Sequence, residues 1–198
     1  TLIYKLKLEA SHSIWSEYYE EAAKRNDYLD QKKQLIQNWV SNLPDIKTAA
    51  DLGANDGVFS KILAEKNVST IATDFDPLCI NHLYNDIKKS KQQNILPLII
   101  DLANPSPAIG VNNTERLSFI SRTKVDLGIA LAVIHHLAIG KNISFEKIAL
   151  FFSGLSNYLI IEFVPKEDEK IQFMLKSKID TYSDYTQEHF ESVFSRHY

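Results

Sequence analysis

The chain has 198 residues, which predicts one domain of ordinary size, and 44% of them are hydrophobic, enough to build a core. The formal net charge of −3 gives no strong sign of a nucleic-acid-binding surface, and the single cysteine, Cys79, excludes an intrachain disulfide and favours a reducing, cytoplasmic setting. No apolar run approaches the ~18 residues of a membrane span, and no basic-then-apolar leader opens the chain. Because the chain begins with Thr1 rather than Met, we expect it to be part of something longer.

The first 44 residues are expected to form an extension in front of the main domain. Residues 1–8 alternate apolar and charged side chains, which predicts a short half-buried strand. Residues 11–24 and 27–42 have helical spacing, and Pro44 closes the second helix. Five residues of the second helix are expected to face inward: Leu35, Ile36, Trp39, Val40 and Leu43. Three aromatic residues of the first either pack on the sheet or form a lid: Trp15, Tyr18 and Tyr19. We therefore divide the chain into a strand and helical extension or lid, 1–44, and a main domain, 45–198.

A glycine-containing turn follows the first strand of the main domain. Its sequence is Asp-Leu-Gly-Ala-Asn-Asp-Gly at 51–57, and a helical pattern begins at Val58. Such a turn places free backbone N–H groups and a helix N-terminus at the carboxyl edge of a sheet, where open α/β folds bind nucleotide-like ligands. Asn55 stands at the centre of the turn, and asparagine tolerates left-handed backbone angles better than other non-glycine residues.

The spacing within this turn indicates what kind of ligand it suits. A dinucleotide fingerprint needs G-x-G-x-x-G, but the chain has D-x-G-x-x-x-G with two carboxylates, Asp51 and Asp56. Carboxylates would repel a pyrophosphate and suit a ligand with positive charge, such as the ammonium and sulfonium of S-adenosylmethionine. An ordinary strand-to-helix turn without a ligand is the alternative.

Acidic residues also follow the next two strands. Residues 68–73 have a strand pattern that ends at Asp74, about 20 residues beyond the glycine turn, where a carboxylate can accept hydrogen bonds from ribose hydroxyls. A helix-capping role is the alternative for this acidic pair, but it fits Asp76 better, because Pro77 suits a first helical position. The third strand, 95–100, ends at Asp101.

A loop and a buried strand come next. Two prolines and a glycine in 104–110 predict a loop at the sheet edge where a substrate would approach. Residues 115–120 predict a helix capped by Thr114. The continuous apolar run at 125–132 is typical of a central parallel strand covered on both faces.

Two further positions are candidates for catalysis. His135 and His136 follow the fourth strand, and one of them either lines the cleft as a base or orienting group or only packs at a helix start. Adjacent histidines point in different directions and no Cys/His cluster accompanies them, so we expect no metal site. Glu162 lies near the carboxyl end of the fifth strand, 158–164, and is a candidate base or substrate anchor.

The alternation of strands and helices predicts an α/β fold with a doubly wound, mostly parallel, Rossmann-like sheet of five core strands and an N-terminal helical extension. The apolar fifth strand would then form an edge, which proteins normally protect. We expect the N-terminal strand, a further C-terminal segment or a second molecule to cover it.

The sequence resembles that of class I S-adenosylmethionine-dependent methyltransferases. The turn resembles their motif I, usually D-x-G-x-G-x-G, with Asn55 in place of the central glycine, and Asp74 matches their motif II. Over residues 14–198 the chain is similar to host-specificity nodulation proteins, on segments such as Asn-Pro-Ser-Pro-Ala-Ile-Gly at 104–110 and Ala-Leu-Ala-Val-Ile-His-His-Leu at 130–137. Where that subfamily often has Trp after the loop glycine, this chain has Val111.

The resemblance implies a fold, a cofactor and a set of site residues. It implies a class I methyltransferase fold with S-adenosylmethionine as the cofactor, and because that fold usually has seven strands while five are counted here, we expect the C-terminal strand hairpin to be lacking. Ten residues would hold that cofactor: Asp51, Gly53, Ala54, Asn55, Gly57, Asp74, Phe75, Asp101, Leu102 and Ala130. Within that set Asp74 would bind the ribose and Asp101 the adenine amino group, with Leu102 against the ring. If the acceptor has to lose a proton, His135 and Glu162 are the candidate bases.

The expected activity is methyl transfer to an unidentified O, N or C nucleophile. The sequence has no Asn-Pro-Pro-Tyr motif, which would favour methylation of adenine N6 or of a glutamine amide. Cys79 opens a helix rather than a catalytic-cysteine motif, so the chemical class of the methyl acceptor is not identified. Two alternatives remain: a non-catalytic module that binds S-adenosylmethionine and works by interaction, and an NAD-dependent oxidoreductase, against which the missing dinucleotide fingerprint counts.

Overall fold

The computed structural model describes residues 26–176 and 178–198. Its centre is one sheet of five strands that are all parallel, in the order β3-β2-β1-β4-β5. The strands are β1 (Thr48–Leu52), β2 (Ser69–Asp74), β3 (Ile95–Ile99), β4 (Val125–Ala130) and β5 (Ser156–Ile161). The strand order reverses between β1 and β4, and open α/β sheets bind ligands at such a switch point. The predicted Rossmann-like sheet is confirmed.

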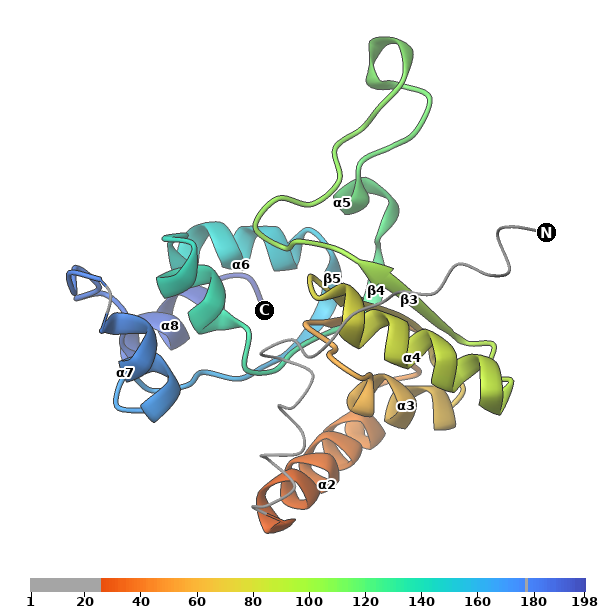
Figure 1. Ribbon diagram of the computed structural model, residues 1–198, viewed down its shortest axis with the longest axis horizontal. Coiled ribbons are helices and arrows are strands. Elements are labelled where there is room, and N and C mark those ends of the chain that lie inside the picture. The colour runs from red at the N-terminus through yellow and green to blue at the C-terminus, as the bar shows by residue number, and fades with distance from the viewer. Residues whose placement is uncertain (1–25, 177) are drawn as a thin grey trace.

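Helices cover both faces of the sheet (Figure 1). One group is α2 (Asn26–Asn42), α3 (Val58–Glu65) and α4 (Pro77–Ser90), and the other is α6 (Phe145–Ser153), α7 (Glu169–Leu175) and α8 (Gln187–Phe194). Alternate residues of β1 serve the two faces, because side chains alternate along a strand. Ala49 packs with α2 and α3, whereas Ala50 and Leu52 pack in the cluster that includes α6 and α8. Burial on both faces explains the long apolar run of β4.

The long connection after β3 differs from the expected helix over 115–120. Ile109 and Arg116 form a β-bridge, and a 3₁₀ turn, η2 (Val111–Asn113), lies between them. Helix α5 begins only at Phe119 (Phe119–Arg122). The backbone N–H groups of Glu115 and Arg116 both donate to the carbonyl of Ile109, which holds them out of a helix. Ser118, not Thr114, caps α5. The connection extends away from the body of the molecule (Figure 1).

The N-terminal extension is described from Asn26 onward. Helix α2 confirms the second predicted helix, and Ile36 and Val40 are buried as expected. Leu35 and Trp39, also expected to face inward, are 44% and 46% exposed, so the buried face of α2 is narrower than its apolar pattern. The predicted strand 1–8, the helix 11–24 and its three aromatic residues lie outside the described residues.

β5 is an outer strand of the sheet, as predicted, and no described strand pairs with its far side. In the part of the chain described, no helix has the length and apolar character needed to cross a membrane. The cytoplasmic setting stays a prediction.

Candidate functional site

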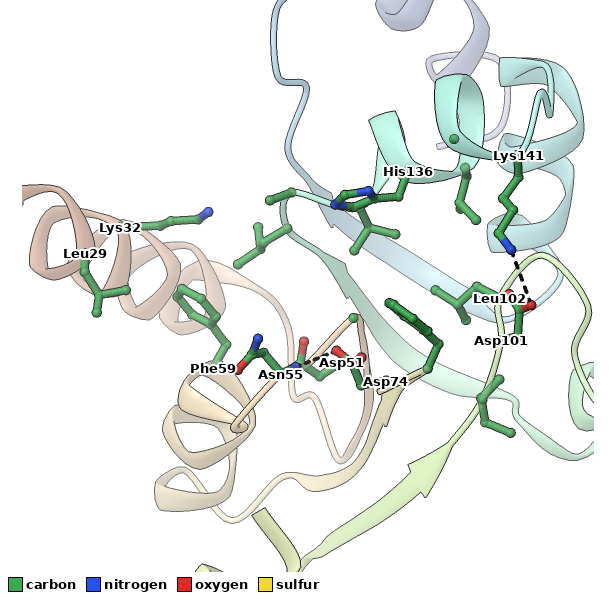
Figure 2. A pocket seen from close by; sticks show the side chains of 18 of the residues that line it. Leu29, Lys32, Asp51, Asn55, Phe59, Asp74, Asp101, Leu102, His136 and Lys141 are labelled. Atoms are coloured by element: carbon green, nitrogen blue, oxygen red, sulfur yellow. Dashed lines mark hydrogen bonds and ion pairs between the residues drawn. The ribbon is translucent and has the colours of Figure 1, made fainter. Parts of the chain in front are cut away.

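A cavity of about 270 Å³ opens at the carboxyl ends of the strands (Figure 2). The segments after β1, β2, β3 and β4 all contribute to its wall, and so do α2 and α3. Seven of the ten predicted cofactor residues line it: Asp51, Gly53, Asn55, Asp74, Phe75, Asp101 and Leu102. Ala54, Gly57 and Ala130 do not. The fold therefore brings residues from three separate strand ends to one place.

The glycine turn is tied to the end of β2. The N–H groups of Gly53 and Ala54 both donate to the carbonyl of Thr73 at 2.8 Å, and the N–H of Asn55 donates to Oδ2 of Asp74 at 2.9 Å. Asn55 has a φ of 50°, which confirms that asparagine supplies the left-handed residue here. Gly57 also has positive φ, at 73°, and forms the N-cap of α3. These hydrogen bonds hold the turn against the end of β2, where it lines the cavity.

Gly53 is required on two grounds. Its φ of 84° is a conformation that L side chains rarely adopt, and a Cβ there would meet Cγ2 of Val133 at 2.4 Å. Val133 belongs to the segment after β4 and also lines the cavity. The turns after β1 and β4 are thus packed tightly against each other at the point where the strand order reverses.

Both oxygens of Asp74 are fixed by main-chain donors. Oδ2 accepts from Asn55 and Oδ1 accepts from the N–H of Asp76 at 2.9 Å. Each carboxylate oxygen can accept a further bond, so the group is held ready for hydroxyl donors in the cavity. Burial raises the pKa of Asp74. Asp76 caps α4 through a bond from the N–H of Leu78 at 2.8 Å, which confirms the capping role expected for Asp76, while the ribose role of Asp74 stays a prediction.

Asp51 is a carboxylate enclosed by the fold. It is 2% exposed, it accepts a hydrogen bond from the hydroxyl of Ser60 at 2.6 Å, and burial raises its pKa to about 6. A buried carboxylate is costly unless a cation or strong donors meet it. Since Asp51 lines the cavity, a cationic group bound there would relieve this cost.

The opposite end of the cavity is more open. Asp101 accepts from the N–H of Ala103 at 2.9 Å, and Lys141 lies 3.9 Å from its carboxylate. Phe75, directly after β2, is 58% exposed although it borders the cavity. An exposed aromatic ring in the wall of the cavity offers a surface for a flat ligand ring.

The two histidines are placed differently from the prediction. His136, not His135, lines the cavity, whereas His135 is 4% exposed and its Nδ1 has no partner among the described residues. Burial lowers the pKa of His136 to about 4 and that of His135 to about 3, so both are neutral at neutral pH. The segment runs into a π-type turn, η3 (His136–Gly140), and the rings contact each other at 4.1 Å. A catalytic role for His135 has no support from this placement.

Glu162 does not line the cavity either. Its two oxygens are bonded to α2, Oε1 to the hydroxyl of Tyr28 at 2.9 Å and Oε2 to Nζ of Lys32 at 2.6 Å. The nearby ammonium of Lys32 stabilises the ionised form of Glu162 and so opposes its taking up a proton. Its role as a base stays a prediction that the geometry does not favour.

Helix α2 supplies residues that the sequence did not identify. Tyr28, Leu29 and Lys32 all line the cavity. The apolar pattern of α2 marks only its contact with the sheet, and no motif singles out Lys32. No group of three or more His, Cys, Asp or Glu side chains in the described ranges is arranged to hold a metal ion.

Comparison with known proteins identifies the fold. The bifunctional kinase-methyltransferase WbdD superposes with a TM-score of 0.58 over 94% of this chain and 39% of that chain, at 18% identity. Magnesium protoporphyrin IX methyltransferase (ChlM) from Synechocystis PCC 6803, solved with bound SAH, gives 0.56 over 84% of this chain and 71% of that chain, at 17% identity. The chain has the class I methyltransferase fold.

The sequence comparison agrees with the resemblance to nodulation proteins. No protein-family model matches the chain. The nodulation protein NoeA of Rhizobium meliloti (strain 1021) is 36% identical over 185 residues, which is 93% of this chain. The match covers 38% of NoeA, so this methyltransferase-like chain spans well under half the length of that relative.

Proposed function

We propose that this chain binds S-adenosylmethionine in the cavity and transfers its methyl group to an O, N or C nucleophile. The observation that carries the proposal is the convergence of Asp51, Asp74 and Asp101, from the ends of β1, β2 and β3, on one cavity together with the Gly53–Gly57 turn. Neighbours with this fold are methyltransferases, and ChlM was solved with SAH, which supports the same ligand class here.

The residues present fit that cofactor. Asp51, buried and without a cationic partner at hydrogen-bond distance among the described residues, would pair with the ammonium of the methionine end. Asp74, held by two main-chain donors, would accept from the ribose hydroxyls. Asp101 would accept from the adenine amino group while Phe75 and Leu102 contact the ring.

The charge of the cavity argues against a dinucleotide. Three carboxylates line it, and a pyrophosphate would bring negative charge next to them. The turn also lacks the middle glycine that lets backbone amides approach a pyrophosphate. An NAD-dependent oxidoreductase is therefore the weaker alternative.

The chemistry that the cofactor supplies is an activated methyl: the nucleophile bonds to the methyl carbon as the carbon–sulfur bond breaks, the bonding electron pair stays on sulfur, and the product is S-adenosylhomocysteine. The chain's residues would bind and position the reactants, which can account for much of the acceleration. A nucleophile that carries a proton would lose it to solvent, because burial lowers the pKa of His136, the histidine in the cavity wall, to about 4 and makes it a weak base.

The first experiment is calorimetric titration with S-adenosylmethionine, S-adenosylhomocysteine and NAD in parallel. We expect the two adenosyl ligands to bind and NAD not to bind. Binding of NAD alone would overturn the assignment in favour of an oxidoreductase. If neither adenosyl ligand binds, the proposed cofactor is wrong.

Transfer is tested separately from binding. The protein is incubated with methyl-labelled S-adenosylmethionine and fractionated cell extract, alongside the Asp74→Ala variant. Label that moves into a fraction only with the unchanged protein supports an enzyme. Tight cofactor binding with no label transferred from any fraction supports the non-catalytic module instead.

A further inference from the structure

We infer that Lys32 of α2 binds the carboxylate at the amino-acid end of the cofactor, so that the helix preceding the sheet completes the cofactor site. The inference rests on the proposed function, because it names a residue for one part of that ligand. It concerns a side chain that comes from outside the glycine turn and the strand ends.

The Lys32 side chain is held in one place before any ligand arrives. It is 13% exposed, its Nζ lies 2.6 Å from Oε2 of Glu162, and it stands over the rings of Tyr28 at 5.6 Å and Phe59 at 5.8 Å. Lysine is seldom this buried unless it is paired. Because contacts from three sides already order the side chain, a ligand that used it would pay little further ordering entropy.

The ammonium of Lys32 has capacity for a second partner. An ammonium carries three donors, and within the described part of the chain the recorded hydrogen bond of Lys32 is the one to Glu162. Figure 2 shows the side chain extending from α2 into the cavity, on the same side as Phe59 and Asn55. A donor therefore reaches the ligand space beside the glycine turn.

The position of Lys32 relative to Asp51 fits an amino-acid group. The positive charge of Lys32 acts on Asp51 and lowers the pKa of that carboxyl, although burial dominates and raises it overall. An α-amino acid carries its ammonium and its carboxylate on one carbon. When the ammonium pairs with Asp51, the carboxylate needs a cation or N–H donors close by.

Among the described lining residues, two lysines could supply that cation. Lys141 lies 3.9 Å from Asp101, at the end assigned to adenine. Lys32 lies at the end where Phe59 and Asn55 line the wall (Figure 2), and its charge acts on Asp51. Its positive charge and its position at this end of the cavity make Lys32, rather than Lys141, the partner of the ligand carboxylate.

Glu162 acquires a positioning role in this arrangement. It holds Lys32 from the side away from the ligand and also binds the hydroxyl of Tyr28. The charges would then alternate from Asp51 to ligand ammonium, ligand carboxylate, Lys32 and Glu162. This accounts for a carboxylate at the end of β5 that faces α2 rather than the cavity.

The test removes the ammonium of Lys32 from the protein and, separately, the carboxylate from the ligand. Titrations of wild type and Lys32→Met use S-adenosylmethionine and decarboxylated S-adenosylmethionine, which lacks only the carboxylate. We expect Lys32→Met to weaken binding of S-adenosylmethionine by about tenfold or more and to change binding of the decarboxylated ligand by less than about twofold. Lys33→Met is the matched control, since Lys33 is on the same helix, pairs with Asp30 and does not line the cavity.

Two outcomes would overturn the inference. Equal losses for both ligands would mean that Lys32 only positions α2, and no loss for either would mean that the carboxylate is held elsewhere. Lys32→Arg keeps the charge and should retain the preference for the carboxylated ligand, so it serves if the Met variant unfolds. Failure of the wild-type protein to bind any adenosyl ligand would instead refute the proposed function.

Discussion

Asp51 places a carboxylate inside the protein at the wall of an open cavity, with its pKa raised by burial to about 6. A cation bound beside it favours the ionised form, so binding at lower pH must first displace a proton. We expect the affinity for S-adenosylmethionine to be highest between about pH 6 and about pH 8, where Asp51 is ionised and the α-amino group of the ligand is still charged, and to fall as the pH drops through about 6. Calorimetric titrations with S-adenosylmethionine at several pH values across this range measure the change in affinity.

Asp51→Asn is the control for this pH dependence. The variant should bind S-adenosylmethionine more weakly at neutral pH and show little change in affinity as the pH falls through about 6, because no carboxylate titrates at that position. A wild-type affinity that stays level through that pH would show that the ammonium does not lie against Asp51.

Asp74 gives a second prediction about a single residue. Asp74→Ala removes the acceptor that two main-chain N–H groups hold in place, and it should weaken cofactor binding by more than about tenfold in calorimetry. Asp86→Ala removes an exposed carboxylate on α4 that pairs with Lys61 and should leave the affinity unchanged. Equal affinities for wild type and Asp74→Ala would place the ribose elsewhere.

At these positions the sequence was informative to different degrees. An acidic residue at the end of an apolar run breaks the pattern, so Asp51, Asp74 and Asp101 could be predicted as strand-end residues. The histidine that faces the cavity could not be chosen, because the left-handed residue Ala132 and the π-type turn after it set the direction of both rings. Lys32 could not be found, since its partners are distant in sequence.

Among the elements, the segment after β4 carries local strain. Ala132 lines the cavity with a φ of 53°, a left-handed conformation that costs a non-glycine residue of order 1–3 kcal/mol. Ala132→Gly removes this strain but increases the entropy of the unfolded chain by roughly 0.4–1 kcal/mol. We expect a net gain of about 1 kcal/mol in the free energy of unfolding, measured with denaturant.

A matched substitution separates strain from a general effect of glycine. Ala72 is fully buried in β2 and does not have positive φ, so Ala72→Gly relieves nothing and should lower the free energy of unfolding. If both variants are destabilised to the same extent, the backbone at Ala132 holds no strain worth removing.

The presence of a helix or strand was easier to predict from the sequence than the residues at which it begins and ends. Strands and helices with long apolar patterns, such as α2 and β4, appear where expected. The helix expected over 115–120 fails because helical spacing over six residues is a weak signal, and a bridge to Ile109 competes for the same N–H groups. On α2 the apolar pattern was wider than the buried face, so Leu35 and Trp39 are exposed.

For the molecule as a whole, the proposed site links ligand binding to stability. A ligand that binds only the folded state adds RT ln(1 + [L]/Kd), about 2.7 kcal/mol at a hundredfold excess over Kd. We expect S-adenosylmethionine and S-adenosylhomocysteine to raise the melting temperature in a concentration-dependent way, whereas NAD at the same concentrations leaves it unchanged. A shift from NAD of similar size would indicate a site that does not distinguish these ligands.

The doubly wound parallel sheet could be predicted because alternating strands and helices leave few arrangements, whereas the strand order was not predicted. The placement of α2 could not, because nothing in its own sequence says which end of the sheet it meets. The outer position of β5 follows from the strand count and is confirmed.

The predicted boundary at residue 44 separates α2 from the sheet, although α2 forms part of the cavity wall. The sheet alone would be a natural unit to exchange between proteins, since it contains every recognised motif. A recombination break between α2 and β1 would transfer those motifs with one side of the pocket missing. A unit that carries all of the described cavity wall therefore begins before the sheet and includes α2.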